Sequence, residues 1–529
     1  MGWQQQEETQ LTPLSRDAAE RAAEDVPGLT LLAHADPRRV GERLALPALA
    51  AGREVRLARS DPVFRAPRRQ EARPLDDRSI SRQPIRLVPG GEPGAVTLDV
   101  GASRTAVAAD GEPVAGRRPF SAAEVERGVV LLVGRRVVLL LHRMPLQPPA
   151  DEPGFDLVGE STGIVRVRQE IRRLADLDLP VLLRGETGTG KEIVARALHE
   201  AGERRRHPFV AVNMAAVPPA LAASELFGAT RGAYTGAERN KVGFFQHAEH
   251  GTLFLDEIGE TPPEVQPMLL RALESHEILP VGAVEPRKVD VRVIAATDVR
   301  LGDAINAGRF RAPLFHRLAG YSIRLPALAE RRDDFGRLLF FFLDQELRKI
   351  GEAPLEGSER PWPPAEVVAR LGRYDWPGNV RELRNVARWL AIAGRRSPSH
   401  ELGARLGEIL DGSAVHVPPR CPEESKTVVA KRRLLRNPAE VSEKELRAAL
   451  RTHHWKLSAT AEALGVSRTA LYRLIDECPA IRKAADLGRE EIEEALRRCG
   501  GELERAAGEL EVSLRGLKRR MTALGLDRS

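Results

Sequence analysis

Cysteines, aromatic residues and long apolar runs are all scarce in this chain of 529 residues. The three cysteines, Cys421, Cys478 and Cys499, lack metal-ligand spacing, which argues against a cysteine-based metal site and indicates a reducing compartment. No apolar run reaches the roughly 20 residues that span a bilayer. The first residues, "MGWQQQEETQ", lack the basic and apolar blocks of a signal peptide. We therefore expect a cytoplasmic protein with no membrane segment.

Aromatic residues make up only 4% of the chain, so its cores must consist of Leu, Val, Ile and Ala. The length exceeds what one core supports, and two to four domains are expected. The net charge is +6, and residues 431–529 hold 21 Lys and Arg against 16 Asp and Glu, a difference of +5. Such an excess fits either nucleic-acid binding or an ordinary solvated surface.

The N-terminal region, residues 27–147, alternates short apolar runs with turns. Period-two patterns and β-branched residues between Gly, Pro and Asp clusters predict an all-β sandwich. The predicted strands lie in "REVRLARSD", "SISRQPIRLVP", "GAVTLDV", "GVVLLVG" and "RRVVLLLHR". A proline-rich linker, "RMPLQPPADEPG", follows, and strands then alternate with helical patterns, which is typical of an α/β domain with a parallel sheet.

The segment "VLLRGETGTGKEIVARALH" reads as a strand, a glycine-rich loop and a helix. Backbone N–H groups of such a loop surround phosphates, and Lys191 would reach the β- and γ-phosphates. The Ser or Thr usual after this lysine is replaced by Glu192, so a hydroxyl ligand for Mg²⁺ is missing. The candidate phosphate-binding residues are Gly185, Glu186, Thr187, Gly188, Thr189, Gly190, Lys191 and Glu192.

A second strand, "GTLFLDEIGE", ends in two carboxylates. Asp256 would hold Mg²⁺ and Glu257 would polarise a water, although an edge strand with acidic ends is the alternative. The strand "VRVIAATD" places Thr297 and Asp298 where a γ-phosphate sensor would lie. Arg311 and Arg317 are surface charges or arginine fingers that reach a neighbouring subunit. Together these residues predict an oligomeric ATPase that uses ATP and Mg²⁺.

From about residue 155 to 395 the chain resembles the AAA+ domain and lid of bacterial sigma-54-dependent transcriptional activators. The motifs that carry the resemblance are "GETGTGKE", "VNMAA", "SELFG", "GAYTGA", "GTLFLDEIGE", "FRAPLFHRL", "LPALAERRDD" and "YDWPGNVREL". The family commonly has Glu after the lysine, which accounts for Glu192. By resemblance Asn213 pairs with Glu257 as a nucleotide switch, Arg381 is the sensor II residue of the lid, and Arg311 and Arg317 are arginine fingers.

The loop "GAYTGA" corresponds to the Gly-Ala-Phe-Thr-Gly-Ala signature with which the family grips the sigma-54 factor. Glycines let such a loop move, and an aromatic ring supplies contact area at low entropy cost. The resemblance implies contact with sigma-54 through Gly232, Ala233, Tyr234, Thr235, Gly236 and Ala237.

The C-terminal tail is predicted to be helical, follows a linker at 396–438, and contains a repeat with an offset of 46 residues. "AEALGVSRTALYR" begins at Ala461 and "AGELEVSLRGLKR" begins at Ala507, which gives two units, at 439–478 and 486–526. The first is similar to the family's Fis-type helix-turn-helix, and a dimerisation hairpin is the alternative. The expected DNA-binding residues are Ser467, Arg468, Thr469, Tyr472 and Arg473.

The N-terminal region resembles, more weakly, a forkhead-associated domain, which reads phosphothreonine. "VRLARSD" is similar to its Gly-Arg-Ser turn, with Ala58 in place of glycine, and "RSISRQP" has Pro84 where a histidine is expected. By resemblance Arg59, Ser81 and Arg82 hold a phosphate. A sandwich kept only for protein contact is the alternative.

The sequence thus predicts a multidomain protein with an all-β N-terminus, an α/β P-loop ATPase with a helical lid, and a duplicated all-α helix-turn-helix. Its implied function is to bind double-stranded enhancer DNA and, as a homo-oligomer, a hexamer, to remodel sigma-54 RNA polymerase with ATP. Two other readings are an AAA+ motor that acts on another DNA-bound protein, and a repressor with an inactive ATPase core. The presence of Lys191, Asp256, Glu257 and both arginines argues against the repressor.

Overall fold

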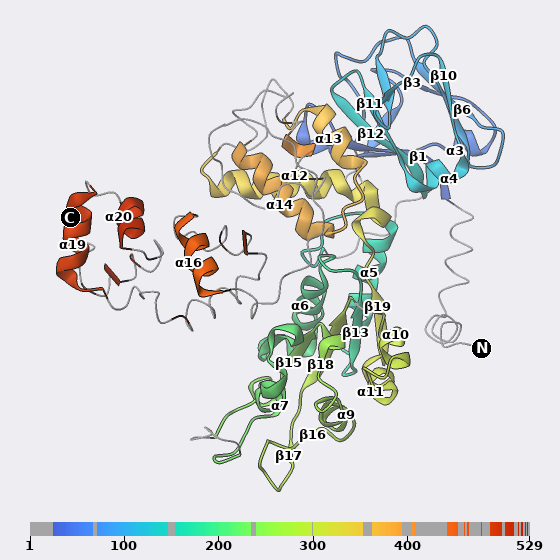
Figure 1. Cartoon of the computed structure of the whole chain (residues 1–529). Coiled ribbons are helices and arrows are strands. Elements are labelled where there is room, and N and C mark those ends of the chain that lie inside the picture. The colour runs from blue at the N-terminus through green and yellow to red at the C-terminus, as the bar shows by residue number, and fades with distance from the viewer. Residues whose placement is uncertain are drawn as a thin grey trace. The chain divides into compact units, whose positions relative to one another are not determined.

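The structure is a computed structural model of the whole chain. It describes residues 25–66, 71–146, 154–233, 240–298, 300–352 and 362–393, and parts of the C-terminal segment, mainly 442–452, 487–499 and 503–510. The chain divides into two compact units, Met1–Val417 and Pro418–Ser529 (Figure 1). No described helix is both long and apolar enough to cross a membrane.

The N-terminal region of the first unit consists of two antiparallel sheets. The order of the larger sheet is β5-β4-β2-β1-β12-β11-β8-β9, and that of the smaller is β10-β7-β6-β3. The strands are β1 (Asp25–Ala33), β2 (Arg43–Ala45), β3 (Val55–Leu57), β4 (Val63–Arg65), β5 (Ala72–Pro74), β6 (Ile85–Pro89), β7 (Val96–Asp99), β8 (Val107–Ala109), β9 (Glu112–Pro113), β10 (Arg117–Phe120), β11 (Val129–Val133) and β12 (Val137–Pro145). Short helices η1 (Pro37–Arg39), α3 (Pro47–Ala50) and α4 (Ala122–Arg127) connect them.

The two sheets share one apolar core, to which β1, β11 and β12 contribute from the larger sheet and β3, β6 and β7 from the smaller. The five strands predicted from the sequence are present as β3, β6, β7, β11 and β12. The other strands are short or, like β1, lack a clear period-two pattern.

Strands β1, β11 and β12 are apolar on both faces, unlike strands with one solvated face. In β12, Leu139 and Leu141 point into the shared core, whereas Val138 and Leu140 point the other way, into a second cluster that includes helices of the lid. Alternate side chains of a strand project to opposite faces, so a continuous apolar run indicates cover on both sides. The runs "VVLLV" and "VVLLL" therefore indicate that the larger sheet is covered on both faces. The prediction of a simple sandwich did not include this second covering layer.

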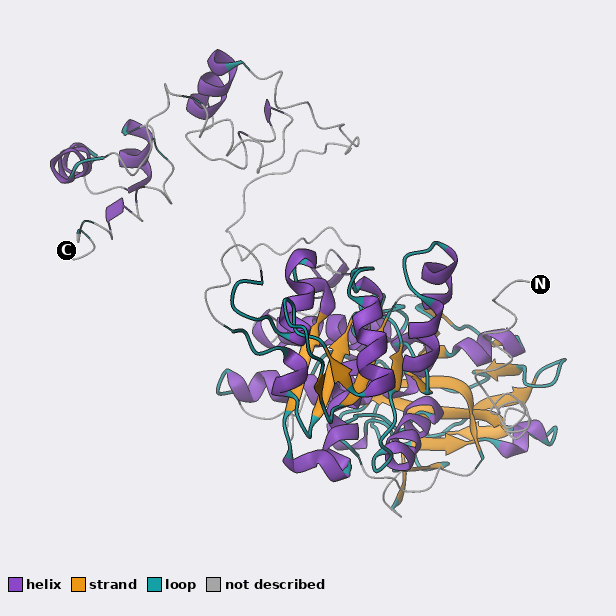
Figure 2. Cartoon of the chain, turned by 90° about the horizontal axis from the view of Figure 1, so that it is seen from below, coloured by secondary structure: helices purple, strands orange, loops and turns teal. Residues whose placement is uncertain are grey.

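The central domain is built on a parallel sheet of order β14-β15-β18-β13-β19. Its strands are β13 (Val181–Arg184), β14 (Phe209–Asn213), β15 (Thr252–Asp256), β18 (Arg292–Thr297) and β19 (Tyr321–Arg324). Helices cover both faces of this sheet (Figure 2). The helices are α5 (Thr162–Leu174), α6 (Lys191–Ala201), η2 (Glu203–Arg206), η3 (Met214–Ala216), α7 (Pro219–Phe227), α8 (Phe244–His247), η4 (Ile258–Glu260), α9 (Gln266–Ser275), α10 (Leu301–Asn306) and α11 (Ala312–Leu318).

Burial on both faces explains why these strands are uniformly apolar. Phe254 packs with α5 and α6, while its neighbours Leu253 and Leu255 pack with α7, α9 and α11. Because all five strands are parallel, their carboxyl ends meet at one edge of the sheet. Ligands of open α/β sheets bind at this edge.

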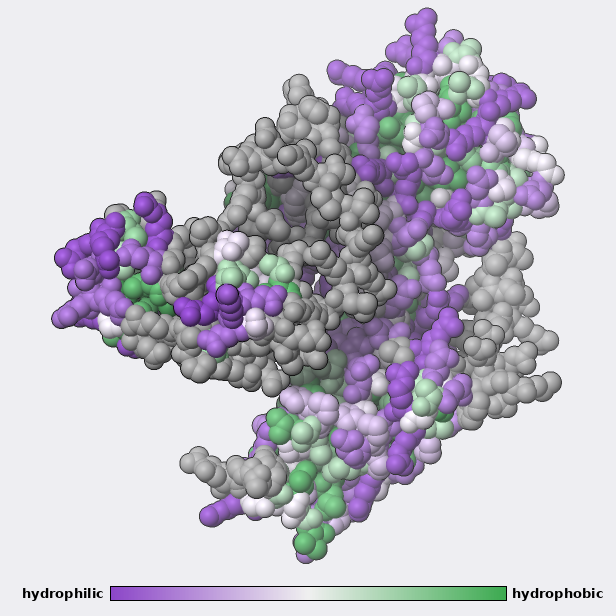
Figure 3. All heavy atoms as spheres, in the orientation of Figure 1, coloured by the Kyte–Doolittle hydropathy of each residue, from purple (hydrophilic) through white to green (hydrophobic). Residues whose placement is uncertain are grey.

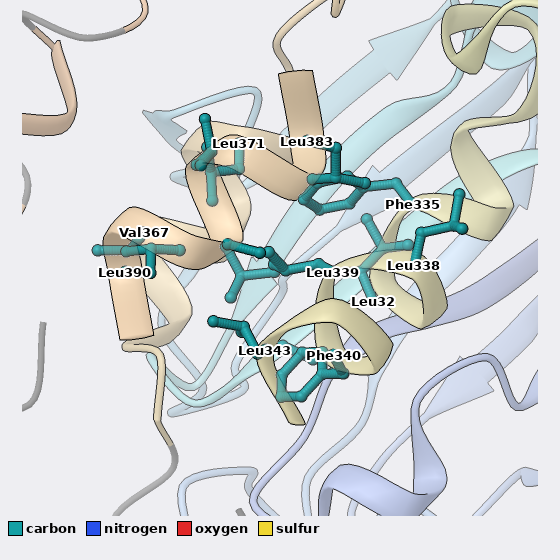
Figure 4. Close-up of a cluster of buried hydrophobic side chains, with 14 of the residues drawn as sticks. Leu32, Phe335, Leu338, Leu339, Phe340, Leu343, Val367, Leu371, Leu383 and Leu390 are labelled. Atoms are coloured by element: carbon teal, nitrogen blue, oxygen red, sulfur yellow. The ribbon is translucent and has the colours of Figure 1, made fainter. Parts of the chain in front are cut away.

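The lid follows β19 and comprises η5 (Leu328–Arg331), α12 (Arg332–Lys349), α13 (Ala365–Gly372) and α14 (Asn379–Ala393). Its core packs directly on the N-terminal β-sheet, and Leu32 of β1 lies in the same cluster as Phe335, Leu338 and Leu339 of α12 (Figure 4). At the rim Arg43 of β2 forms an ion pair with Asp333, with Nη2 and Oδ2 2.6 Å apart.

The second unit contains helices α16 (Glu443–Thr452), α19 (Arg489–Arg498) and α20 (Leu503–Glu509). Positions 46 residues apart have the same burial: Leu446 and Ile492 are buried, as are Leu464 and Leu510. Thr460 and Ala506 are both fully buried. The matching burial supports the prediction that the tail holds two copies of one helical unit.

Candidate nucleotide site and its surroundings

The glycine-rich loop joins β13 to α6 at the carboxyl edge of the sheet. Gly188 and Gly190 have φ of +83° and +104°, a conformation that favours glycine. Lys191 is buried, and its Nζ donates to the carbonyl of Gly185 at 2.8 Å and to that of Glu186 at 3.4 Å. The Lys191 ammonium therefore folds back onto the loop at the N-terminus of α6, and this concave surface is where a phosphate-binding loop holds phosphates.

The residue after the lysine is not part of this concave surface. Glu192 is exposed and lies 3.7 Å from Arg196 one turn later in α6. Its carboxylate is thus engaged on the outside of the helix. Glu192 therefore does not take the place of the Ser or Thr hydroxyl that binds Mg²⁺ in other phosphate-binding loops.

Asp256 and Glu257 lie at the end of β15, next to the loop. Burial raises the pKa of Asp256, and the positive charges of Lys191 and Arg381 oppose this rise. Glu257 has a left-handed backbone with φ of +53°, which is uncommon for a residue with a side chain. Burial, aided by a hydrogen bond with Asp298, raises the pKa of Glu257 to about 7. A carboxylate that titrates near neutrality has the basicity of a general base.

Asp298 joins the end of β18 to the phosphate loop, because Thr187 Oγ1 donates to Asp298 Oδ2 at 2.6 Å. Burial acts to raise the pKa of Asp298, but hydrogen bonds from Thr187 and Glu257 outweigh it and hold that pKa below its usual value. Thr297 is buried one residue earlier. The structure thus brings together Lys191, Asp256 and Asp298 from three separate segments.

Asn213 lies at the end of β14 and is paired in register with Asp256. Its side-chain oxygen accepts a hydrogen bond from the N–H of Ala215 at 2.9 Å and so caps η3. The side-chain oxygen of Asn213 is thus bonded to its own segment of the chain. The pairing of Asn213 with Glu257 as a nucleotide switch stays a prediction.

The lid reaches the phosphate loop through the turn that precedes α14. The N–H of Val380 donates to the carbonyl of Gly188 at 3.0 Å. Asn379 is fully buried and donates to Glu186 Oε2 at 2.9 Å and to the carbonyl of Thr187 at 3.2 Å. Arg381, two residues later, acts electrostatically on Asp256. Asn379 is not among the site residues predicted from the sequence, although the Gly-Asn pair at the start of α14 is a turn signal that could have indicated it.

Arg311 is the N-cap residue of α11, Arg317 lies in the last turn of that helix, and both residues are exposed. The guanidinium of Arg317 donates from Nε and Nη2 to the carbonyl of Leu273, at 3.0 and 2.8 Å. The backbone N–H of Arg311 donates to Gln266 Oε1 at 2.9 Å. The backbone of Arg311 is thus bonded to the first residue of α9 and the side chain of Arg317 to a residue near its end, and their action on a neighbouring subunit stays a prediction.

The glycine-rich surface loop rises from a short paired stalk. Ala229 exchanges backbone hydrogen bonds with Lys241 at 3.0 and 2.8 Å, and Thr230 N–H donates to the carbonyl of Val281 at 2.9 Å. Gly232 has φ of +79° and open space around it. Of the residues expected to contact sigma-54, Gly232 and Ala233 are described, whereas Tyr234, Thr235, Gly236 and Ala237 lie outside the described residues.

A hairpin made of β16 (Glu277–Ile278) and β17 (Arg287–Lys288) supports this stalk. Val284, between its two strands, is 94% exposed. Figure 3 shows apolar surface at the end of the molecule where Figure 1 labels these strands. A contiguous apolar patch on the surface, rather than one exposed side chain, is typical of a contact surface.

A second candidate site is a cavity of about 370 Å³ in the N-terminal region, lined by Arg59, Arg78, Ser79, Ile80, Ser81, Arg82 and Arg104. Arg59 donates to the carbonyls of Asp77 at 3.0 Å and Arg78 at 2.6 Å, so it holds the loops together. Arg82 and Arg104 are exposed and form no ion pair with any described residue. Four arginines without a lining carboxylate suit an anion. Arg59, Ser81 and Arg82 were predicted from the sequence, whereas Arg78 and Arg104 were not, because only the fold brings them together with the others.

The residues expected to read DNA, Ser467, Arg468, Thr469, Tyr472 and Arg473, lie outside the described residues. The second copy has its own apolar core, which includes Leu487, Ile492, Ala507 and Leu517. A separate core of this kind is expected of an independent helical unit.

Comparison with known families assigns the main segments. Residues 157–324 match the sigma-54 interaction domain, and residues 329–401 match the AAA+ ATPase lid domain. Residues 438–477 and 483–524 each match the bacterial regulatory protein, Fis family. The last two matches cover both copies of the C-terminal repeat.

Two curated transcription regulators and one solved structure are among the proteins similar to this chain. The DNA-binding transcriptional regulator NtrC of Salmonella typhimurium is 40% identical over 351 residues, which cover 64% of this chain and 73% of that protein. The nitric oxide reductase transcription regulator NorR1 of Cupriavidus necator is 40% identical over 339 residues, which cover 62% of this chain and 65% of that protein. NtrX from Brucella abortus in complex with ADP is 30% identical, with a TM-score of 0.43 and 70% of each chain covered. The chain spans about half to three quarters of the length of such curated relatives.

Proposed function

The chain belongs to the family of sigma-54-dependent transcriptional regulators, and we propose that it hydrolyses ATP to activate transcription by sigma-54 RNA polymerase from DNA-bound positions. The observation that carries this proposal is the meeting of Lys191, Asp256, Glu257 and Asp298 at the carboxyl edge of the parallel sheet. Its place of action is the cytoplasm, where DNA and polymerase are found.

Each residue of the site has a separate role in hydrolysis. The phosphate loop, Gly185 to Lys191, binds the β- and γ-phosphates through N–H groups and the Lys191 ammonium. Asp256 is a partly buried carboxylate near a lysine, and its hard oxygens suit Mg²⁺, which would neutralise charge on the phosphates. Glu257 accepts the proton of the attacking water, since its pKa lies near neutrality. Arg381 would contact the phosphates from the lid.

Hydrolysis is proposed to require a homo-oligomer, in which Arg311 and Arg317 act on the nucleotide of the neighbouring subunit. Both residues are exposed, Arg311 as the N-cap of α11 and Arg317 in its last turn, and both lie outside the chain's own phosphate loop. Positive charge supplied in trans stabilises the transition state of phosphoryl transfer. A hexameric ring is the arrangement that the family implies.

Sigma-54 is proposed to bind the loop Gly232–Ala237, with Tyr234 as its aromatic anchor. Backbone hydrogen bonds between Ala229 and Lys241 hold the two ends of the loop together. The hairpin beside them carries the exposed Val284. The alternative target, another DNA-bound protein, differs only in what this loop captures. A pull-down with purified sigma-54 in the presence of a transition-state analogue of ATP therefore tests the choice: retention of sigma-54 by the full chain is expected, and its absence would favour the alternative.

The N-terminal region is proposed to be a forkhead-associated-like sandwich that binds a phosphothreonine protein in the arginine-lined cavity. Arg78, Arg82 and Arg104 supply charge, and Ser79 and Ser81 supply hydroxyl groups. Phosphothreonine peptides should bind the full chain and lose affinity on Arg104→Ala. Arg56→Ala removes the same charge outside the cavity, where Arg56 pairs with Glu54 at 2.9 Å, and serves as the matched control. Equal binding by all three proteins would contradict the assignment.

The C-terminal unit is proposed to bind enhancer DNA through Ser467, Arg468, Thr469, Tyr472 and Arg473. Base contacts by arginine in the major groove each contribute about 1–3 kcal/mol of discrimination. The role of the second copy is DNA contact or dimerisation. Its own apolar core, with Ile492 and Leu517 buried, supports an independent unit in either role.

A further inference from the structure

We propose that Asn379 is a positioning residue of the ATPase, which fastens the lid to the phosphate loop so that Arg381 faces the reacting phosphates. This inference rests on the proposed ATPase function and assigns a residue that neither the phosphate loop nor the acidic strand includes. Asn379 touches the loop itself and acts through Arg381.

The side chain of Asn379 joins three segments that are distant in the sequence. Its Oδ1 accepts the N–H of Leu328, the first residue of η5, at 2.7 Å. Its Nδ2 donates to Glu186 Oε2 at 2.9 Å and to the carbonyl of Thr187 at 3.2 Å. One amide thus uses its acceptor toward the lid and its donor toward the phosphate loop.

Few side chains suit both the burial and the left-handed backbone of this position. Asn379 is fully buried, so unmatched polar atoms would be costly here. Its backbone has φ of +51°, in the left-handed region that Asn, Asp and Gly tolerate best. Glycine would provide the backbone without the bonds, and Asp would provide only acceptors. Asn is the residue that supplies the backbone, the acceptor and the donor together.

The surrounding backbone shows how closely the two parts are joined. A Cβ on Gly188 would lie 2.4 Å from the carbonyl oxygen of Gly378 and 3.1 Å from Cβ of Arg381. The N–H of Val380 donates to the carbonyl of Gly188 at 3.0 Å. Arg381 follows Asn379 by two residues at the start of α14, so a shift of this turn moves its guanidinium as well. The hydrogen bonds of Asn379 therefore fix the position of Arg381.

Asn379→Asp is the sharpest test, because it keeps the shape, the left-handed backbone and the acceptor for Leu328. It replaces the donor by a carboxylate that faces Glu186 Oε2 and the Thr187 carbonyl. We expect kcat for ATP to fall about 10- to 100-fold, the range of one hydrogen bond to a charged group. The ATP dissociation constant should change less than kcat, because Lys191 and the loop N–H groups remain in place.

The second arm is a rescue. Glu186→Gln supplies a donor opposite the new carboxylate, so the Glu186→Gln/Asn379→Asp double variant should recover about 10-fold of the lost kcat. Each value is compared with Glu186→Gln alone. Should Asn379→Asp melt early, the double variant, in which donor and acceptor match again, carries the comparison.

The third arm asks whether Asn379 acts through Arg381. In the Asn379→Asp background, Arg381→Ala should reduce kcat by less than 3-fold, although it reduces kcat strongly in the wild-type background. Fully multiplicative losses, or a kcat for Asn379→Asp equal to that of the wild type, would overturn the proposal. An inactive wild-type chain would instead remove the ATPase function on which the proposal rests.

Discussion

At the scale of single residues, Glu257 is the group whose chemistry is set most clearly by its surroundings. Burial raises its pKa to about 7, and the hydrogen bond with Asp298 contributes. The basic form of this carboxylate is the one that accepts a proton from water. Its population therefore grows as the pH rises through 7.

The first prediction follows from this titration. ATP hydrolysis by the full chain should rise between pH 6 and pH 8, with a limb centred near the pKa of Glu257. Asp298→Asn removes a negative charge and an acceptor that favour the protonated form of Glu257, so the limb should move to lower pH. Initial rates at saturating ATP across this range measure it. A limb that stays in place in Asp298→Asn would contradict the role given to the hydrogen bond.

A second prediction separates binding from hydrolysis. Lys191→Ala should abolish ATP binding, because it removes the buried ammonium that reaches the phosphates. Glu257→Gln should bind ATP and reduce hydrolysis by about 10²–10⁴-fold, the usual contribution of a general base. Filter binding of labelled ATP beside a phosphate-release assay distinguishes the two variants. Normal turnover by either one would rule out this site.

At the scale of elements, the lid helix α12 is shared between the ATPase and the N-terminal sheet. Gly336 lies within α12, where glycine is unfavourable by about 1 kcal/mol relative to Ala. A Cβ there would lie 2.6 Å from the carbonyl oxygen and 2.9 Å from Cα of Leu32 in β1. The glycine therefore lets a β-strand backbone approach the helix directly.

The third prediction compares two glycines that face the same leucine. Gly336→Ala should lower the free energy of unfolding by about 1–3 kcal/mol, as overpacking does, despite its gain in helix propensity. Gly372→Ala should be less destabilising than Gly336→Ala, because the atoms nearest to its Cβ all belong to side chains: Leu32 Cδ1 at 3.3 Å, Val130 Cγ2 at 3.5 Å and Phe335 Cε1 at 3.7 Å. Denaturant melts of both variants make the comparison. Equal free energies of unfolding for the two variants would contradict the close contact between α12 and β1.

At the scale of the whole molecule, activity is expected to belong to an assembly. The fourth prediction is that Arg311→Ala and Arg317→Ala lose hydrolysis but keep ATP binding, because each guanidinium acts on a neighbouring nucleotide. Subunits with Glu257→Gln carry intact arginines, so mixing them with an arginine variant should restore some complete interfaces. Phosphate release is measured across mixing ratios. Mixtures that never exceed the sum of their components would contradict action in trans.

Local signals made the phosphate loop and the acidic strand predictable, because Gly185–Lys191 and Asp256–Glu257 are each continuous in the sequence. The repeat was also predictable, since Leu446 and Ile492 occupy equivalent buried positions. The bonds of Asn379 and the approach of Leu32 to Gly336 were not, because they join segments far apart in the chain. The same holds for Arg104 in the anion cavity, which contributes only after three loops converge.

The measurement that tests the central proposal most directly is open-complex formation by purified sigma-54 RNA polymerase at a promoter with a bound upstream site for this chain. Permanganate footprinting of the melted promoter should show opening with the wild-type chain and ATP, and none with Lys191→Ala or with ATP withheld. Tyr234→Phe should open the promoter and Tyr234→Ala should not, while both keep ATPase activity, because an aromatic anchor commonly contributes about 2 kcal/mol to an interface. A wild-type chain that hydrolyses ATP and binds the DNA but leaves the promoter closed would contradict the account.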